Sequence, residues 1–252
     1  MLRPNRVSAS DRIDCRRQLP PAPQGMTIYA VGDIHGRLDL LEDIFRNIDA
    51  DKVSFRSQRV VEVYLGDYID RGGDSAGVVD RLMSRAREVH AIFLRGNHEQ
   101  LLLDFTAGQP CLDAWKAVGA IPTLLSYGVP PSQLVYPASQ DEVRRALHER
   151  LPKEHCNFFM DTGSYCNAGS YLFVHAGIRP EVDLDKQAMH DFISIREEFL
   201  EFKKSFNWIV VHGHTPVMEA DFRSNRINID TGAYATNRLT CLRIGEGGPR
   251  IL

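Results

Sequence analysis

Carboxylates, imidazoles and an amide gather in five short glycine-containing motifs along this sequence. The motifs are GDIHG at 32–36, GDYIDRG at 66–72, GNHE at 96–99, HAG at 175–177 and HGHTP at 212–216. Carboxylate, imidazole and amide-oxygen ligands together suit a divalent cation such as Mn, Fe or Zn. Two such ions roughly 3.5–4 Å apart can hold a bridging hydroxide and clamp a phosphoryl group for in-line attack. The residue types therefore predict a two-metal centre for phosphoryl chemistry.

The spacing within the motifs divides the ligands between two ions. Asp33 and His35 lie two residues apart directly after an apolar run, so both can face one ion. Asp67 can bridge the two ions through its two carboxylate oxygens. The remaining ligands, which then belong to the second ion, are Asn97, His175 and His214. A single aspartate after a strand is usually a turn or cap residue, so the prediction depends on the ordered series of five motifs.

Most of these motifs end a short apolar run that is rich in β-branched or aromatic residues, which is typical of a buried strand. The predicted strands cover 27–33, 60–67, 90–97, 170–177, 208–214, 226–232 and 238–244. Apolar residues recur at helical spacing after Gly36 and after Gly73, where Asp74 or Ser75 can cap the second helix. The order β-α-β-α-β predicts an α/β core, in which the carboxyl ends of the strands bring the motifs to one rim.

The segment 100–168 has a different character, because helical patterns there surround the proline-rich stretch GVPPSQLVYPAS. We expect a mainly helical insertion that covers one end of the sheet. The strand pattern resumes directly afterwards and no internal repeat is found, so residues 26–252 are predicted to form a single domain. Residues 1–25 carry arginine and proline without an apolar stretch, which predicts a flexible N-terminal arm.

The overall composition is that of an ordinary globular protein and excludes several classes. With 43% hydrophobic residues and a net charge of −3 over 252 residues, the chain is neither mainly disordered, nor collagen-like, nor a disulfide-rich miniprotein. Five cysteines without a CxxC motif argue against a zinc finger. The near-neutral charge predicts no stable nucleic-acid partner, and no apolar run is long enough to span a membrane. We therefore expect a cytoplasmic protein with no membrane partner.

Together the five motifs resemble those of the metallophosphoesterases of the phosphoprotein phosphatase type. The similarity runs from about Thr27 to Gly232 and is greatest to small bacterial serine/threonine protein phosphatases and related diadenosine-tetraphosphatase-like enzymes. It implies an α/β layered fold with a central β-sandwich flanked by helices. It also implies two divalent metal ions per chain, with Mn²⁺ expected and Fe or Zn as alternatives. The implied ligands are Asp33, His35 and Asp67 for one ion, and Asp67, Asn97, His175 and His214 for the other.

The same resemblance implies the remaining catalytic and substrate-binding groups. His98 is expected to protonate the leaving oxygen and Asp70 to orient its ring, and an imidazole titrates in the range that this requires. Arg71 is expected to bind phosphoryl oxygens as a planar fork, together with the amide of Asn97. A second phosphate-binding arginine is implied between the fourth and fifth motifs. Arg196, in FISIREEFL, matches it best.

Several residues near the motifs depart from the family pattern or have no assigned role. Gly73 follows DRG where relatives often have another small residue or proline, and Ser194 stands where bacterial relatives often carry an aromatic residue. Pro216 follows GHT where the wider superfamily has another histidine, which leaves the first ion fewer protein ligands and more water. We interpret His212 as a residue that lies either behind the ligands or at the rim of the site, and not as a ligand. Tyr234 is equally consistent with the site and with the core.

The predicted function is that of a metal-dependent serine/threonine protein phosphatase, with His98 as general acid and phosphorylated proteins or peptides as partners. GDYIDRG together with GNHE is its main support, and Arg179, after HAG, is the alternative to Arg196. Hydrolysis of dinucleoside polyphosphates such as diadenosine tetraphosphate is the alternative activity for the same metal centre. A cyclic-nucleotide or nucleic-acid phosphodiesterase is a weaker alternative, and so is a noncatalytic scaffold, because every expected position is filled. The oligomeric state is left open.

Overall fold

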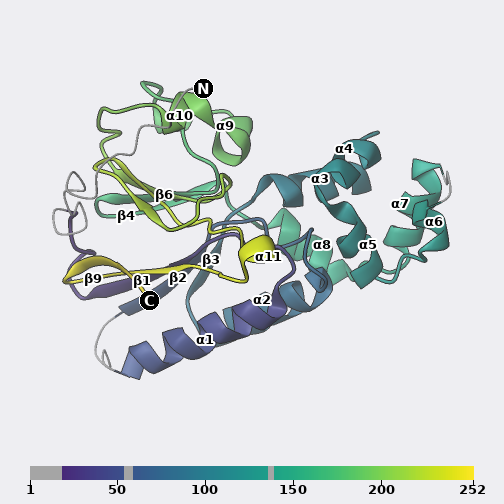
Figure 1. The fold of residues 1–252 in the computed structure, drawn as a ribbon, viewed down its shortest axis with the longest axis horizontal. Coiled ribbons are helices and arrows are strands. Elements are labelled where there is room, and N and C mark those ends of the chain that lie inside the picture. The colour runs from purple at the N-terminus through teal and green to yellow at the C-terminus, as the bar shows by residue number, and fades with distance from the viewer. Residues whose placement is uncertain (1–18, 54–58, 136–138) are drawn as a thin grey trace, which may run out of the picture.

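Two five-stranded β-sheets pack face to face in the computed structural model, which describes residues 19–53, 59–135 and 139–252 (Figure 1). The first sheet has the order β10-β9-β1-β2-β3, and the second has the order β4-β5-β6-β8-β7. The strands of the first sheet are β1 (Met26–Val31), β2 (Arg59–Tyr64), β3 (Ala91–Phe93), β9 (Cys241–Gly245) and β10 (Gly248–Ile251). Those of the second are β4 (Tyr165–Ala168), β5 (Tyr171–Val174), β6 (Ile209–His212), β7 (Asp221–Phe222) and β8 (Arg226–Asn228).

The central strands are continuous apolar runs because both of their faces are buried. In β1, Ile28 and Ala30 pack in the core between the sheets, whereas Tyr29 and Val31 pack in the core on the helical side. Strands β1, β2 and β3 pair in parallel, and so do β5, β6 and β8. Their carboxyl ends therefore bring the five motifs to the same end of the sandwich, as the parallel order predicts.

Helices cover the outer faces of both sheets. Figure 1 shows α1 (Leu38–Lys52) and α2 (Ser75–Glu88) along the outside of the first sheet. The buried positions of α1 follow the predicted helical spacing and are Leu41, Ile44, Phe45 and Ile48. The Asp74 carboxylate caps α2 by accepting a hydrogen bond from the Gly77 amide at 2.9 Å. On the second sheet, α9 (Met189–Ser194) and α10 (Glu197–Leu200) cover the outer core. The layered α/β prediction is confirmed.

The predicted insertion is helical as far as Met160. Its helices are α3 (Asn97–Thr106), α4 (Leu112–Val118), α5 (Ala120–Ser126), α6 (Ser132–Val135), α7 (Gln140–His148) and α8 (Lys153–Met160). Figure 1 places them beside the sandwich, so that they extend the molecule to one side. Residues 165–168, which the prediction included in the insertion, instead form strand β4.

The sequence patterns do not predict β4, β7 and β10, and all three strands lie at an edge of a sheet. An edge strand is not enclosed on all sides, so it does not need the continuous apolar run that marks a central strand. Pro249 in β10 is consistent with an edge position, because proline cannot donate a hydrogen bond to a neighbouring strand. The predicted central strands also end earlier in the structure, because the motif residues at their ends form loops.

Part of the predicted N-terminal arm belongs to the sandwich. Leu19 and Ala22 are buried in the core between the sheets, and the Ala22 amide donates a hydrogen bond to the Gly245 carbonyl at 3.1 Å. The Tyr171 hydroxyl donates to the Pro20 carbonyl at 2.5 Å. Residues 19–25 are thus held by burial and backbone pairing, whereas residues 1–18 of the arm lie outside the described residues. Within the described ranges, no helix is both long and apolar enough to cross a bilayer.

Candidate metal centre and active site

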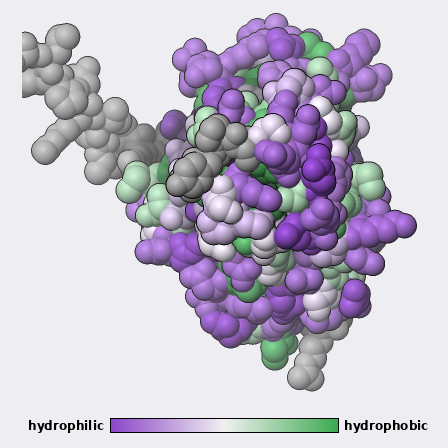
Figure 2. Space-filling view, turned by 90° about the vertical axis from the view of Figure 1, so that its right-hand side faces the viewer, coloured by the Kyte–Doolittle hydropathy of each residue, from purple (hydrophilic) through white to green (hydrophobic). Residues whose placement is uncertain are grey.

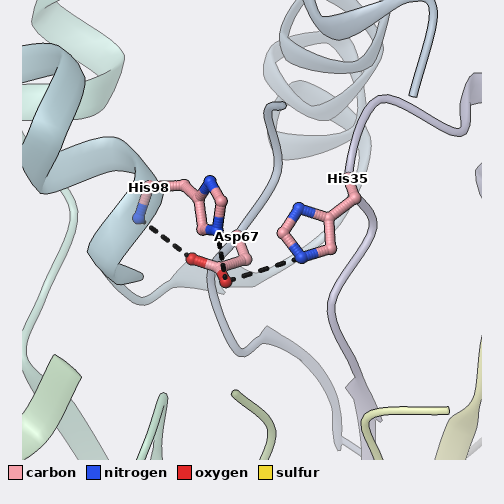
Figure 3. A group of neighbouring side chains, drawn as sticks. All are labelled: His35, Asp67 and His98. Atoms are coloured by element: carbon pink, nitrogen blue, oxygen red, sulfur yellow. Dashed lines mark hydrogen bonds and ion pairs between the residues drawn. The ribbon is translucent and has the colours of Figure 1, made fainter. Parts of the chain in front are cut away.

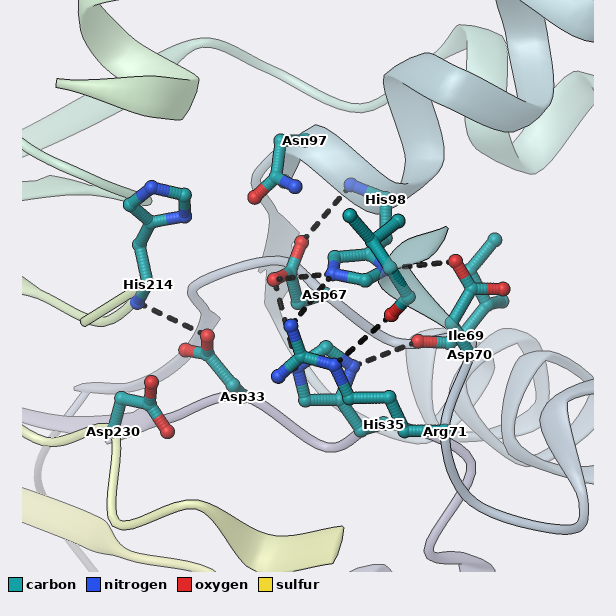
Figure 4. Close-up of polar contacts among 12 residues, drawn as sticks. Asp33, His35, Asp67, Ile69, Asp70, Arg71, Asn97, His98, His214 and Asp230 are labelled. Carbon is teal, nitrogen blue, oxygen red and sulfur yellow. Dashed lines mark hydrogen bonds and ion pairs between the residues drawn. The ribbon is translucent and has the colours of Figure 1, made fainter. Parts of the chain in front are cut away.

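The motif loops at the end of the sandwich hold several residues in unusual backbone conformations. Left-handed φ angles of 48°, 51°, 73°, 67° and 64° occur at His35, Asp67, Asp70, Arg71 and His214. This conformation costs a non-glycine residue on the order of 1–3 kcal/mol, so it persists only where surrounding contacts hold it. Three other non-glycine residues in the described part of the chain share it. Backbone strain is therefore concentrated where the predicted site lies (Figure 4).

Asp67 lies between two groups of candidate metal-binding side chains. Its Oδ2 atom is 3.6 Å from Nε2 of His35 and 3.7 Å from Nε2 of His98 (Figure 3). Its Oδ1 atom is 3.4 Å from Nε2 of His175, and His214 completes this second group. In each group the donor atoms lie within 4.8 Å of one another. The two oxygens of Asp67 thus face two different pairs of imidazoles, as a bridging carboxylate requires.

Asn97 and Asp33 lie beside these groups. The Oδ1 atom of Asn97 is 3.2 Å from Nε2 of His175. Asp33 accepts a hydrogen bond from the backbone amide of His214 at 3.0 Å through Oδ2, as Figure 4 shows. The other Asp33 oxygen and Nε2 of His214 are buried and have no hydrogen-bond partner among the described residues. Because such orphaned polar atoms are rare and costly, they indicate a missing ligand that a cation would supply.

Backbone carbonyls fix two of the imidazoles in an orientation that suits metal binding. The carbonyl of Ile69 is 2.9 Å from Nδ1 of His35, and that of Leu65 is 3.0 Å from Nδ1 of His175. A carbonyl can only accept, so the proton of the neutral ring is on Nδ1 in both cases. Each Nε2 then presents its lone pair to the cluster, which is how the contacts around a metal site usually orient its histidines.

Burial and neighbouring charges shift the pKa values of these groups in opposite directions. Burial lowers the pKa of His35 to about 3 and that of His214 to about 2, so both rings are neutral. Burial also disfavours the charged form of His175, but the Asp67 carboxylate overcomes this effect and raises its pKa to about 10. Burial and repulsion from neighbouring carboxylates raise the pKa of Asp33 well above its usual range. The rings of His35 and His214 are thus neutral donors that fit a divalent cation, whereas His175 would release a proton on binding one.

His98 is held in a different way from the other histidines. Its Nδ1 atom donates to Oδ2 of Asp70 at 2.6 Å, and its backbone amide donates to Oδ1 of Asp67 at 3.2 Å. His98 lies close to His35 and Asp67, in the group where the sequence places Asp33. Burial opposes the charged ring, but Asp67 and Asp70 raise the pKa of His98 above its usual value. A ring that a carboxylate orients in this way is better suited to donating a proton than to binding a metal.

The candidate phosphate-binding arginines differ in their contacts. The Arg71 guanidinium donates to Nε2 of His35 at 3.1 Å and lies 3.3 Å from Nε2 of His98 (Figure 4). Arg179 forms ion pairs with Asp191 at 2.8 Å and with Glu198 at 2.9 Å, so its charge is already neutralised. The exposed Arg196 side chain makes no hydrogen bond or ion pair within the described ranges. Its charge is one of the influences, after burial, that lower the pKa of His214.

The structure places two residues whose role the sequence left open. His212 is fully buried and packs edge-on against Phe199, with ring centroids 4.9 Å apart, so it does not lie at the rim. Tyr234, on α11 (Ala233–Thr236), belongs to the site: its ring is 4.6 Å from the Arg71 guanidinium and 5.3 Å from the His35 ring. Its 39% exposure leaves part of the ring open to a ligand.

Further residues of the site were not assigned from the sequence. The Glu99 carboxylate accepts hydrogen bonds from the amides of Gly96, Asp67 and Tyr68 at 3.0, 2.8 and 2.8 Å, and thereby ties the second motif to the third. Asp230, beside Asp33 in Figure 4, contributes to the repulsion that raises the pKa of Asp33. Glu99 lies inside GNHE, and Asp230 lies near the end of a predicted strand. Their positions in the sequence could therefore have indicated a role in the site. Trp115 and Thr123, which bind Asp70, carry no such signal.

Comparison with known proteins connects this geometry with named relatives. Over 241 residues, the chain is 29% identical to a Bacillus cereus (strain 03BB102) protein named bis(5'-nucleosyl)-tetraphosphatase PrpE [asymmetrical], and the alignment covers 86% of this chain and 89% of that protein. A protein of the same name from Oceanobacillus iheyensis is 27% identical over 244 residues, which cover 88% of this chain and 90% of the relative.

Solved structures share the fold. The crystal structure of a candidate diadenosine tetraphosphatase matches with a TM-score of 0.58 and 21% identity, covering 93% of this chain and 96% of that one. A cold-active protein-tyrosine phosphatase from a Shewanella species matches with a TM-score of 0.55 and 17% identity, covering 100% and 87%. At these identities the likeness concerns the fold alone. The family model described as calcineurin-like phosphoesterase matches residues 26–241. The chain therefore belongs to the calcineurin-like phosphoesterase family.

Proposed function

We propose that this protein is a metal-dependent hydrolase of dinucleoside polyphosphates, with bis(5'-nucleosyl) tetraphosphates as its substrate class. The observation that carries the proposal is the alignment of 86–88% of the chain with relatives named as asymmetrical bis(5'-nucleosyl)-tetraphosphatases. These relatives favour the activity that the sequence offered as the alternative over the serine/threonine protein phosphatase that it placed first. Protein phosphatase activity is the second candidate, and the motifs GDYIDRG and GNHE support it.

An aromatic ring beside a cationic group supports a nucleotide substrate. Tyr234 is partly exposed and lies against the Arg71 guanidinium at 4.6 Å. Stacking on an aromatic side chain is a general way to bind a nucleobase, and a guanidinium fork suits the adjoining phosphate. Arg196 supplies a second charge that is not neutralised by a described carboxylate.

The chain's own residues account for binding and proton transfer in the proposed reaction. Two divalent cations, held by the ligands derived above, would polarise the phosphoryl oxygens and provide a nucleophile at neutral pH. Arg71 and Arg196 bind the phosphate oxygens and orient the chain. Water adds to one phosphorus and releases a proton to solvent, the bond from that phosphorus to the bridging oxygen breaks, and Nε2 of His98 gives its proton to the leaving oxygen. The His98 ring then regains a proton from solvent. Asp70, 2.6 Å from Nδ1, keeps the ring aimed during this transfer.

A substrate panel tests the proposed function. The protein is first treated with chelator, then supplied with Mn²⁺, and kcat/KM is measured for diadenosine tetraphosphate and for phosphoserine, phosphothreonine and phosphotyrosine peptides. We expect the dinucleotide to be preferred by tenfold or more, with ATP and AMP as unequal products. A preference for the phosphopeptides would instead establish the second candidate. Chromatography of the dinucleotide products separates unequal cleavage from the symmetrical release of two ADP molecules.

A further inference from the structure

The Asp70 carboxylate has more partners than the orientation of His98 requires. Its Oδ2 atom accepts from Nδ1 of His98 at 2.6 Å and from the indole Nε1 of Trp115 at 2.7 Å. Its Oδ1 atom accepts from the Thr123 hydroxyl at 2.6 Å, and this hydroxyl in turn accepts from the Asp70 amide at 2.8 Å. All four residues are buried, with exposures of 1% or less. Trp115 is in α4 and Thr123 in α5, so these partners come from the helical insertion.

The next residue, Arg71, is held by the junction between α4 and α5. Its amide donates to the Gly119 carbonyl at 3.0 Å, and its Nε donates to the Val118 carbonyl at 3.2 Å. Gly119 has a φ of 118°, and a Cβ atom there would lie 2.8 Å from Cγ of Arg71. The absence of a side chain at Gly119 therefore lets the α4–α5 junction lie directly against the arginine.

Asp70 and Arg71 need such support because both have left-handed φ angles, of 73° and 67°. Two consecutive strained residues would relax if nothing opposed them, and the side chains would then point elsewhere. Residues 115–123 bind the backbone amides of both residues, because Thr123 accepts from the Asp70 amide and Gly119 accepts from the Arg71 amide. They also bind both side chains. A tryptophan that served only the core could use any carbonyl for its N–H group, whereas Trp115 shares the carboxylate oxygen that binds His98.

The geometry points to residues 115–123 of the helical insertion as a positioning element that aims the proton donor His98, through Asp70, and the phosphate-binding Arg71. This inference rests on the proposed function only in that His98 and Arg71 act in the reaction, and it holds for either substrate class. Trp115 and Thr123 are positioning residues that act on the rate through Asp70. Gly119 acts on substrate binding through Arg71. The insertion thus contributes to the chemistry as well as covering the end of the sandwich.

Substrates that differ only in their leaving group test this inference. Phenyl phosphate depends more on protonation of the leaving oxygen than p-nitrophenyl phosphate does. Trp115→Phe keeps an aromatic ring, and Thr123→Val keeps the side-chain shape, but each removes a donor to Asp70. We expect kcat for phenyl phosphate to fall about tenfold in each variant, with a smaller fall for p-nitrophenyl phosphate and little change in KM, as loss of a hydrogen bond to a charged group predicts. Thr123→Ser, which retains the hydroxyl, should restore the rate.

Matched controls separate positioning from packing. Trp208→Phe removes the other tryptophan, and Thr106→Val removes a hydroxyl that binds only its own helix α3. Both should leave the ratio of the two substrates unchanged. Gly119→Ala should raise KM more than it lowers kcat, because it displaces Arg71. Equal losses on both substrates for Trp115→Phe and Thr123→Val, or effects no larger than in the controls, would overturn the inference.

A proton NMR measurement keeps the inference testable without turnover. The short contact between Nδ1 of His98 and Asp70 predicts a downfield imidazole N–H signal in the wild-type protein, which His98→Asn abolishes. Trp115→Phe should shift or broaden this signal, and Trp208→Phe should not; an unchanged signal in Trp115→Phe contradicts the inference. His98→Asn also separates the two proposals. If it lowers both aryl phosphate rates equally, His98 is not the proton donor and the proposed mechanism fails, whatever the result at Trp115.

Discussion

Two clusters of charged residues differ in how their charges are satisfied: one is centred on Glu62 of strand β2, and the other includes Asp67 in the loop that follows this strand. Glu62 is fully buried, and its carboxylate accepts hydrogen bonds from Arg85 at 2.8 and 3.0 Å, from Tyr64 at 2.6 Å and from Lys52. Arg85 also binds Asp49 at 2.5 and 2.9 Å. In this cluster each charged group faces an opposite charge, and Glu62, despite burial, has a pKa lowered by Arg85.

The cluster that follows β2 is incomplete by the same measure. One oxygen of Asp33 and Nε2 of His214 are buried without a partner among the described residues, and the pKa of Asp33 is raised by burial and repulsion. Glu62 and Asp33 are both buried carboxylates, with exposures of 0% and 2%. The comparison teaches that the balance of partners, more than burial or residue type, distinguishes a structural ion network from a site that awaits a ligand.

The largest expected effect is at the shared carboxylate. Asp67→Asn removes a charge that faces both groups of imidazoles, and we expect metal binding to fall below two ions per chain and kcat to fall on the order of 10³-fold or more. Elemental analysis of the purified variant, together with turnover of diadenosine tetraphosphate, measures both effects. Full retention of two ions would show that the two groups do not depend on Asp67.

The matched change in the complete cluster should affect stability without affecting the metal. Glu62→Gln leaves Arg85 and Lys52 with less negative charge, and breaking a buried ion pair typically costs about 3–5 kcal/mol. We expect that loss in the free energy of urea-induced unfolding, with unchanged metal content in the folded protein. If Glu62→Gln lost metal as Asp67→Asn does, the distinction between the two clusters would fail.

A smaller effect is expected from the arginines that differ in pairing. Arg196→Ala should raise KM for the dinucleotide about tenfold, as the loss of one charge-assisted contact predicts. Arg179→Ala should have a much weaker effect, because Asp191 and Glu198 already neutralise this arginine. Steady-state kinetics of the two variants under the same conditions shows which arginine contributes more to KM. A larger KM increase for Arg179→Ala would reverse the assignment.

The smallest expected effect is a pH dependence of the stability that Glu62 contributes. The folded-state pKa of Glu62 lies below its usual value of 4.5, so its contribution is fully present above that value and is lost as the pH falls through the folded-state pKa. The difference in unfolding free energy between wild type and Glu62→Gln should therefore shrink at low pH. Urea titrations at about pH 7 and about pH 3 measure the difference, and a constant value would contradict the role of the ionised carboxylate.

Much of the fold and of the candidate site could be predicted from the sequence because both depend on local patterns. The central strands are buried on two faces and read as apolar runs, and the parallel order then places the motifs together. The edge strands β4, β7 and β10 could not be predicted in this way, since they need no such run. The partners of Asp70 could not be predicted either, because Trp115 and Thr123 reach it only through the packing of helices 45 and 53 residues away.

The central claim is that the incomplete cluster is completed by two divalent cations and that the reaction depends on them. Metal content and dinucleotide hydrolysis, measured on the same sample after chelation and during stepwise addition of Mn²⁺, test this claim most directly. We predict that chelation abolishes activity and that activity returns as the content approaches two ions per chain. Activity that survives complete removal of metal would contradict the account.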